Sequence, residues 1–225
     1  MRPRIPAMIL VLGTLLGFEP AEAGIMCTWF GRCLYESPGF KITVVDKETG
    51  KPLVDVHALA EWQAYGPYGR NGPLMVQDAV SQADGVLTFL AWGPLHGSRA
   101  GLVINSDPVI TLFKPGYKVL LLNNAVPVGL EETDRVRGFS LGVQSCALER
   151  FRGTPDEWIE QLRKVWRGLA FPRSNLDTLE FRGAYLNRLQ SVWAEREKVP
   201  QHHQTRPGFF WFVQEELKDL MEVQQ

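Results

Sequence analysis

The chain has 225 residues, with 24 lysines and arginines against 25 aspartates and glutamates, and 45% of its residues are hydrophobic. This length suffices for one generous domain, or for a β-sheet domain with a smaller helical piece, and the hydrophobic content can fill a real core. The net charge of -1 is not segregated along the chain. That balance argues against nucleic acid or an anionic membrane surface as the main partner.

Residues 1–23 predict a signal peptide. A basic start precedes an apolar run over residues 8–18, and a small-x-small motif at 21–23 offers a cleavage site before Gly24. The apolar run is too short to span a bilayer, which takes about 20 residues. We therefore expect an exported chain that starts at Gly24 and keeps no stable membrane span.

Three cysteines follow, and an oxidising compartment allows at most one intrachain pair among them. Cys27 and Cys33 are close in sequence, with Gly31 between them to ease a tight loop, and this pair is our disulfide prediction. The alternatives are a bond from Cys146 to either of them, or three independent thiols. No metal site is expected, because no histidine lies at ligand spacing from a cysteine pair.

Strand patterns alternate with turn signals over residues 40–123. The strand patterns cover residues 41–45, 53–62 and 86–92, and the turn signals are the run 46–52, Asp84-Gly85 and Pro115-Gly116. Short strands at this spacing predict a small antiparallel β-sandwich.

Two details of these patterns predict local geometry. The even positions of residues 53–62 are apolar, so we expect them to face the core and His57 and Glu61 to face solvent. Gly50 closes the first turn and Gly116 takes the third position of a type II turn, so both are expected to have a positive φ.

Three stretches, VVDKETGKPLVDV, SQADGVLTFLAWGP and ITLFKPGYKV, resemble the carboxypeptidase regulatory-like domain, a transthyretin-like (prealbumin-type) β-sandwich. The resemblance covers about residues 40–123 of the chain. It implies an accessory, adhesive or ligand-binding module that is only occasionally catalytic. Together with the leader, it implies a bacterial periplasmic or secreted protein.

The catalytic residues of enzyme families with a related sandwich have no counterparts in this sequence. Hydroxyisourate hydrolases end in Tyr-Arg-Gly-Ser, whereas this chain ends in Met-Glu-Val-Gln-Gln. Intradiol dioxygenases hold iron with two tyrosines and two histidines, and His57 and His96 have no matching tyrosine pattern. The zinc-binding His-x-x-Glu of metallocarboxypeptidases and the Gly-x-Ser-x-Gly of serine hydrolases are absent. We therefore expect no enzymatic activity.

Residues 63–74 combine aromatic side chains, a cation, glycines and prolines, and are predicted to form a long loop at one end of the sandwich. Tyr65, Tyr68 and Arg70 are the candidate ligand-binding residues there, because aromatic faces beside a guanidinium can grip a sugar ring or a peptide. The alternative is that both tyrosines pack down and close the sandwich.

Helical patterns begin at Thr154, where Thr-Pro-Asp-Glu is a capping box with proline at the first helical position. A second helix follows a cap at Ser174 and ends before Pro200, and a third starts near Pro207. The apolar faces of these helices either pack on one another and on the sandwich or dock an envelope protein. His202-His203 lies between the last two helices and is interpreted as a solvated polar linker.

These observations predict an α+β protein with a signal peptide (1–23), an N-terminal segment (24–39), a β-sandwich domain (40–145) and a helical region (146–225). The expected function is a non-catalytic binding or structural module without cofactor or metal, and its partner is an envelope protein or a glycan. The alternative is a hydrolase with an unrecognised site in the loops at the end of the sandwich.

Overall fold

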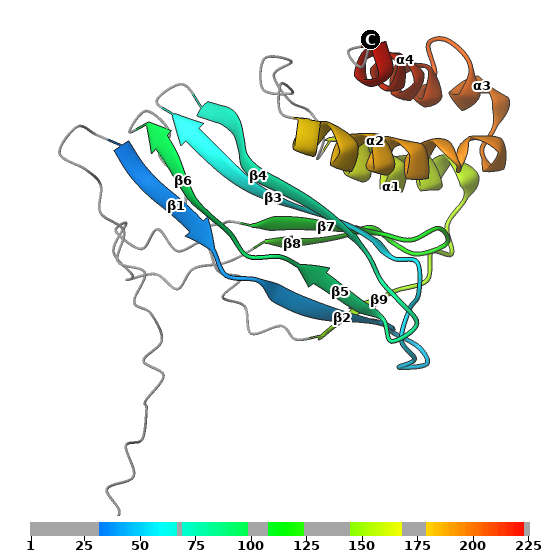
Figure 1. Cartoon of the computed structure of the whole chain (residues 1–225). Coiled ribbons are helices and arrows are strands. Elements are labelled where there is room, and N and C mark those ends of the chain that lie inside the picture. The colour runs from blue at the N-terminus through cyan, green and yellow to red at the C-terminus, as the bar shows by residue number, and fades with distance from the viewer. Residues whose placement is uncertain (1–31, 67–68, 99–107, 124–144, 168–178, 223–225) are drawn as a thin grey trace, which may run out of the picture.

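The computed structural model of the protein describes residues 32–66, 69–98, 108–123, 145–167 and 179–222, and these residues form an α+β fold. The β-strands come first along the chain and the helices last. Figure 1 shows the helices stacked on one side of the strands, so that the strands form one part of the molecule and the helices another.

The described strands form three sheets. One has the order β5-β2-β9, one has the order β4-β3-β7-β8, and β1 pairs with β6 in a separate ribbon. The pairs are antiparallel except for β2 and β9, which run parallel. The strands are β1 (Arg32–Ser37), β2 (Phe40–Asp46), β3 (His57–Gly66), β4 (Gly69–Val80), β5 (Val86–Phe89), β6 (Trp92–Ser98), β7 (Val109–Phe113), β8 (Leu120–Asn123) and β9 (Ser145–Leu148).

Two of these sheets share one hydrophobic core. Strand β3 contributes Ala58, Ala60 and Trp62 to it, as the alternating pattern predicts. Ile42 of β2 and Leu112 of β7 come from the two facing sheets and are both fully buried. The boundary that the sequence suggested at residue 146 falls inside β9, which pairs with β2 and belongs to this part of the fold.

The helical elements cover the opposite face of the β4-β3-β7-β8 sheet. Leu59 of β3 and Phe113 of β7 lie in a second core that is otherwise built mainly from the helices. Phe210 of α4 and Leu162 of α1 are fully buried in it. The elements are α1 (Pro155–Arg167), α2 (Leu179–Trp193), the 3₁₀ turn η2 (Arg196–Lys198), α3 (Gln201–Gln204) and α4 (Phe209–Glu222).

This second core makes one sequence expectation wrong. His57 and Glu61 were expected to face solvent, but Glu61 is only 2% exposed and accepts a hydrogen bond from the Tyr185 hydroxyl of α2 at 3.2 Å. His57 is half-buried, and burial lowers the pKa of its imidazole. The guanidinium of Arg188 donates to the backbone carbonyls of His57 and Thr111, which fastens α2 to the sheet.

The helical predictions agree with the structure where it describes them. The capping box forms: Glu157 N donates to Thr154 Oγ1 at 3.2 Å, and Thr154 N donates to Glu157 Oε2 at 2.7 Å. Helix α4 starts at Phe209, two residues after Pro207. The predicted cap at Ser174 lies outside the described residues. No described helix has the length and apolar composition needed to cross a bilayer.

Both glycines predicted to have a positive φ do so, with φ of 68° at Gly50 and 80° at Gly116. Gly85, after Asp84, is a third case with φ of 74°. A β-carbon would meet no atom within 4 Å at Gly50 or Gly116, whereas at Gly85 it would press against the backbone carbonyl of Val44 in β2.

We predict that Gly85→Val destabilises the protein more than Gly50→Val or Gly116→Val. A β-branched residue at positive φ costs on the order of 1–3 kcal/mol at each position, and only at Gly85 does a backbone clash add to that cost. Urea unfolding of the three variants measures the difference. An equal loss of unfolding free energy at all three positions would contradict this prediction. It would show that the structure removes the clash with Val44 at no cost in stability.

Candidate functional site

The predicted ligand-binding loop is not a loop. Residues 63–66 and 69–73 continue the β3–β4 hairpin, in which Tyr65 pairs with Arg70 and Gly66 with Gly69. Tyr68 lies outside the described residues. The expectation of a long connection over 63–74 is therefore wrong, because glycine and proline punctuate a bulged hairpin here instead of ending the strands. Ligand binding by Tyr65, Tyr68 and Arg70 stays a prediction.

The cysteines offer no reactive group among the residues that the structure describes in side-chain detail. Cys27 lies outside the described residues, and Cys33 is placed on β1 by its backbone pairing with Gly97. Cys146 lies on β9 as a free, half-buried thiol, and burial raises its pKa to about 11. A thiol with this pKa is protonated at neutral pH and is a poor nucleophile.

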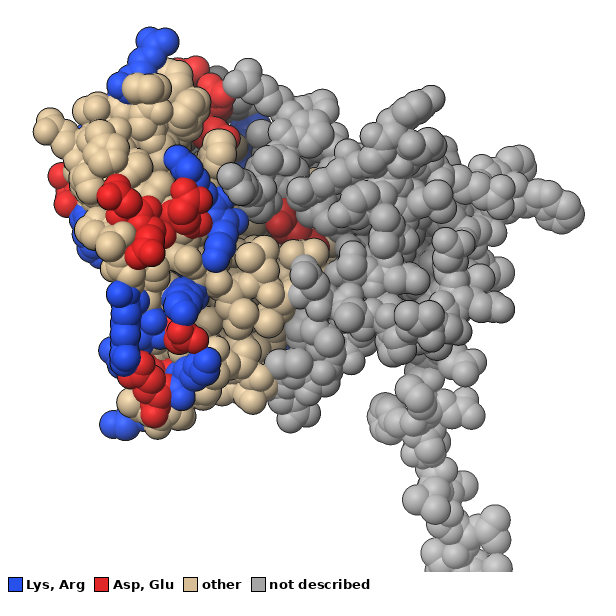
Figure 2. All heavy atoms as spheres, turned by 180° about the vertical axis from the view of Figure 1, so that it is seen from behind, with Lys and Arg blue, Asp and Glu red and all other residues tan. Residues whose placement is uncertain are grey.

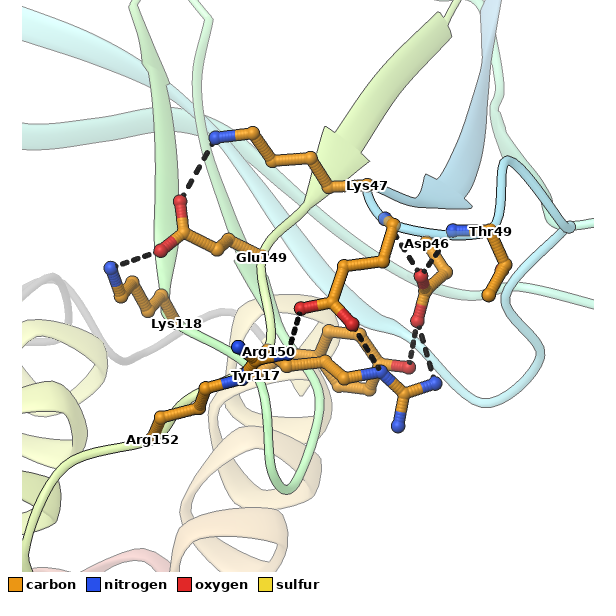
Figure 3. A network of polar contacts seen from close by, with 9 residues as sticks. Asp46, Lys47, Thr49, Tyr117, Lys118, Glu149, Arg150 and Arg152 are labelled. Carbon is orange, nitrogen blue, oxygen red and sulfur yellow. Dashed lines mark hydrogen bonds and ion pairs between the residues drawn. The ribbon is translucent and has the colours of Figure 1, made fainter.

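A network of charged side chains lies where the β-sheets meet the start of α1 (Figure 3). Its buried centre is the Asp46 carboxylate, which accepts from the backbone N–H groups of Glu48 and Thr49 at 2.9 Å each. The Tyr117 hydroxyl donates to it at 2.8 Å, and Arg150 forms an ion pair with it at 2.8 Å. These contacts hold the pKa of Asp46 far below its ordinary value, the hydrogen bond from Tyr117 contributing most.

The outer part of the network is exposed. Glu149 accepts hydrogen bonds from Lys118 and from Lys47, and these two ammonium groups lower its pKa to about 2. Glu48 forms ion pairs with Arg150 and Arg152. Figure 2 shows basic and acidic groups interleaved on the face of the molecule seen from behind.

This network braces the fold, and its two carboxyl groups with shifted pKa values are unsuited to act as a general acid. Its residues come from the turn after β2, the β7–β8 turn and the connection from β9 to α1, so it ties three segments together. A carboxyl group that acts as a general acid near neutral pH needs a raised pKa. The pKa values of Asp46 and Glu149 are both shifted the other way.

Two hollows open beside this network. The larger, of about 900 Å³, is lined by its charged side chains and by Glu157 and Glu160 of α1. The smaller, of about 400 Å³, lies between the β7–β8 turn, the start of α1 and η2. The two share Phe151 and Gly153, so they adjoin across the connection that leads from β9 into α1.

A group of metal-ligating side chains lies at the same end of α1. Within the described residues, Asp156, His202 and His203 bring one ligand atom each to within 4.8 Å of one another. The Asp156 Oδ1 atom is 2.9 Å from His203 Nε2 and 3.5 Å from His202 Nε2. His203 has a side chain only 17% exposed, whereas Asp156 and His202 are open to solvent.

Local structure explains why these residues meet. The capping box starts α1 at Pro155 and places Asp156 in its first turn, where the positive end of the helix dipole favours a carboxylate. The indole N–H of Trp158 donates to the buried carboxylate of Glu195 at 3.2 Å. This bond fastens the segment before η2 to α1, so the following helix α3 carries both histidines to Asp156.

Gly208 closes the turn after α3 against the histidine pair. A β-carbon at this position would overlap the backbone carbonyls of His202, His203 and Thr205. The backbone N–H of Gly208 donates to the Thr205 carbonyl at 2.5 Å. Only a residue without a side chain permits this approach, so Gly208 sets the position of α3.

The 2.9 Å contact between Asp156 and His203 is a hydrogen bond, and the three side chains also lie at a spacing that one divalent metal ion could use. Nitrogen and oxygen ligands of zinc lie about 2.0–2.2 Å from the ion, so ligand atoms at tetrahedral corners are about 3.3 Å apart. The distances of 2.9 and 3.5 Å from Asp156 to the histidines bracket that value. The sequence predicted no metal site, because no histidine lies at ligand spacing from a cysteine pair, and His202-His203 was interpreted as a solvated linker. Asp156 lies 46 positions or more before both histidines, a separation that sequence spacing does not connect.

No family model matches the chain, and no curated protein matches it. Among solved structures, it is similar to a 3-chlorocatechol 1,2-dioxygenase from Rhodococcus opacus 1CP, with 18% identity over 52% of this chain and 61% of that one, at a TM-score of 0.32. It is also similar to the dioxygenase domain of a dioxygenase carbohydrate-binding protein fusion from Streptomyces sp. SirexAA-E, with 23% identity over 52% of this chain and 75% of that one, at a TM-score of 0.28. The chain thus spans less than two thirds of the first of these structures.

These similarities correct the expectation of a non-catalytic module. Both proteins are named as dioxygenases. The prediction that the chain is not an enzyme is therefore withdrawn. At TM-scores of 0.32 and 0.28, the likeness assigns no activity, substrate or metal to this chain.

We predict that the charged network makes stability sensitive to acid. The folded-state pKa of Glu149, about 2, lies below its ordinary value of 4.5. Its stabilising contribution is therefore present above about pH 4.5 and is lost as the pH falls toward about 2. The melting temperature of the wild type should fall over this interval more steeply than that of Glu149→Gln.

Glu160→Gln is the matched control, because Glu160 lines the same hollow and pairs with Arg163 on its own helix. Its melting temperature should follow the wild-type profile. A Glu149→Gln profile that coincides with the wild type over the same interval would mean that the two lysines do not stabilise the ionised carboxylate.

Proposed function

We propose that this protein is exported and acts as a metal-dependent hydrolase, in which Asp156, His202 and His203 bind one divalent transition-metal ion. The leader over residues 1–23 supports export to a bacterial periplasm or to the medium. The shared core of the two larger sheets supports the finer assignment of a sandwich of the carboxypeptidase regulatory-like, transthyretin-like type.

One observation carries this proposal: two imidazoles and one carboxylate converge, and no fourth protein ligand joins them among the described residues. Structural zinc sites are closed by four protein ligands, whereas catalytic sites have three and keep one position for water or substrate. The exposure of Asp156 and His202 leaves solvent access on that side. The donor set is thus of the catalytic kind.

The three residues have separable roles. The Asp156 carboxylate supplies a negatively charged oxygen ligand in the first turn of α1. His203 is shielded from solvent and sets the position of the site, while the exposed His202 completes the donor set on the solvent side. A divalent ion bound by such a set acts as a Lewis acid and lowers the pKa of a water molecule on its open position.

Hydrolysis is the reaction that needs the fewest components beyond this site, because water is the only co-substrate. The water oxygen forms a bond to the electrophilic carbon or phosphorus, the bond to the leaving group breaks, and one proton passes to the leaving group. Two histidines with one carboxylate also suit iron-dependent oxygenation. That reaction needs dioxygen as a further substrate, whereas hydrolysis needs only water, so we favour hydrolysis.

We predict that the chain starting at Gly24, freed of metal with EDTA, binds one zinc ion. Asp156→Asn and His203→Ala should each weaken zinc binding at least tenfold in isothermal titration calorimetry, because each removes one of three ligands. Glu160→Gln on the same helix and His57→Ala on β3 are the controls and should bind zinc as the wild type does.

Activity is measured with the same proteins against chromogenic carboxylic and phosphate esters. Zinc should restore hydrolysis to the EDTA-treated wild type and not to Asp156→Asn. Zinc affinity unchanged by both ligand substitutions would refute the metal site. Activity that requires ferrous iron and dioxygen instead of zinc would refute the proposed hydrolase activity. It would leave the proposed metal-binding site standing.

A further inference from the structure

The smaller hollow, of about 400 Å³, combines an apolar floor with one exposed cation. This volume lies within the range of pockets that hold small ligands. Thr154 and Pro155, which directly precede the metal ligand Asp156, form part of its wall. Lys198, four residues before His202, forms another part. The hollow and the metal site are therefore built on the same two segments.

The floor of the hollow is aromatic. The rings of Phe151 and Trp158 pack with centroids 5.0 Å apart and a tilt of 48°. Trp158 is held in place at its N–H by Glu195, and its ring also packs on Phe113 of the sheet. Trp158 is only 6% exposed and Phe151 is half-buried, so a flat, apolar group gains mainly by burying its ring against Phe151.

The cation is held in a defined position. Lys198 Nζ donates to Glu195 Oε1 at 2.7 Å, and the side chain of Glu195 is buried while that of Lys198 is 60% exposed. An ammonium group has three N–H donors, and Glu195 takes one of them. The remaining N–H donors can form a charge-assisted hydrogen bond with an anion. Such a bond is stronger than one between neutral groups.

We propose that this hollow binds the part of the substrate next to the scissile bond, and that this part is a flat ring carrying an anionic group. The ring packs on Phe151 and Trp158, and the anion pairs with Lys198. The inference rests on the proposed function for its catalytic meaning. Binding in the hollow itself does not need the metal, because none of these three residues is a ligand of it.

Three small probes test the chemistry: N-acetylphenylalanine, its neutral amide, and phenyl phosphate. Each is titrated by calorimetry into the EDTA-treated protein and into the zinc-loaded protein. N-acetylphenylalanine should bind the metal-free protein at least fivefold more tightly than its amide. Tight binding of phenyl phosphate alone would identify the anion as a phosphate, and tight binding of the acid would identify it as a carboxylate.

Lys198→Gln should abolish the preference for the anion, since the amide of glutamine still donates to Glu195 but carries no charge. Lys198→Arg should retain the preference, and it keeps the test valid if the glutamine variant loses stability. Lys164→Gln is the matched control, because Lys164 is exposed on α1, does not line the hollow and donates to Gln161 of the same helix.

Equal affinity for the acid and its amide, or no binding of any probe, would overturn this inference. An anion preference that survives Lys198→Gln would overturn it as well. These outcomes are read from the metal-free protein, whereas the proposed function fails on zinc binding. The two failures are therefore distinguishable in one set of titrations.

Discussion

The fold depends on the burial of one sheet from both sides. Strand β3 points Ala60 and Trp62 into the core shared with the facing sheet, and Leu59 into the core shared with the helices. Polar side chains on a strand that is buried on both faces need hydrogen-bond partners. Glu61 accordingly accepts a hydrogen bond from the Tyr185 hydroxyl. Without the helical elements, the apolar face made by β3, β4 and β7 would be open to water.

Two separate attachments follow from this constraint and hold the helical region against the strands. At one end, the charged network around Asp46 ties the turn after β2 and the β7–β8 turn to the connection into α1. Further along, the ring of Trp158 packs on Phe113 of β7, and its N–H bonds to Glu195 in the segment that leads into η2. The proposed metal site and the smaller hollow lie beside this second attachment. Their geometry therefore depends on packing by residues that are not metal ligands.

Patterns with a local cause were predictable from the sequence. The positive φ values of Gly50 and Gly116, the capping box at Thr154 and the apolar face of β3 each follow from a few neighbouring residues. His57 was placed wrongly because period-two alternation tells which residues share a face, and does not tell that helices cover the other face. The hairpin over residues 63–73 was taken for a loop because its glycines and prolines mark bulges as well as ends.

The proposed metal site belongs to the features that local patterns do not reveal. Asp156 and the two histidines meet only because Glu195 reaches Trp158 and because Gly208 lets the chain turn back on α3. Metal-binding motifs that can be recognised in a sequence have their ligands one helical turn or a short loop apart. His202 and His203 are adjacent, and the third ligand lies on another helix. A signal was nevertheless present, since an aspartate in the first turn of one helix and a histidine pair before another are residue types that bind metal ions.

X-ray absorption spectroscopy at the zinc edge of the zinc-loaded protein tests the central claim most directly. The metal site predicts a first shell of nitrogen and oxygen atoms at about 2.0–2.2 Å and no sulfur, with the outer-shell scattering of two imidazoles, of which one disappears in His203→Ala. A spectrum without imidazole scattering, or one unchanged by His203→Ala, would contradict the assignment of Asp156, His202 and His203 as a metal centre.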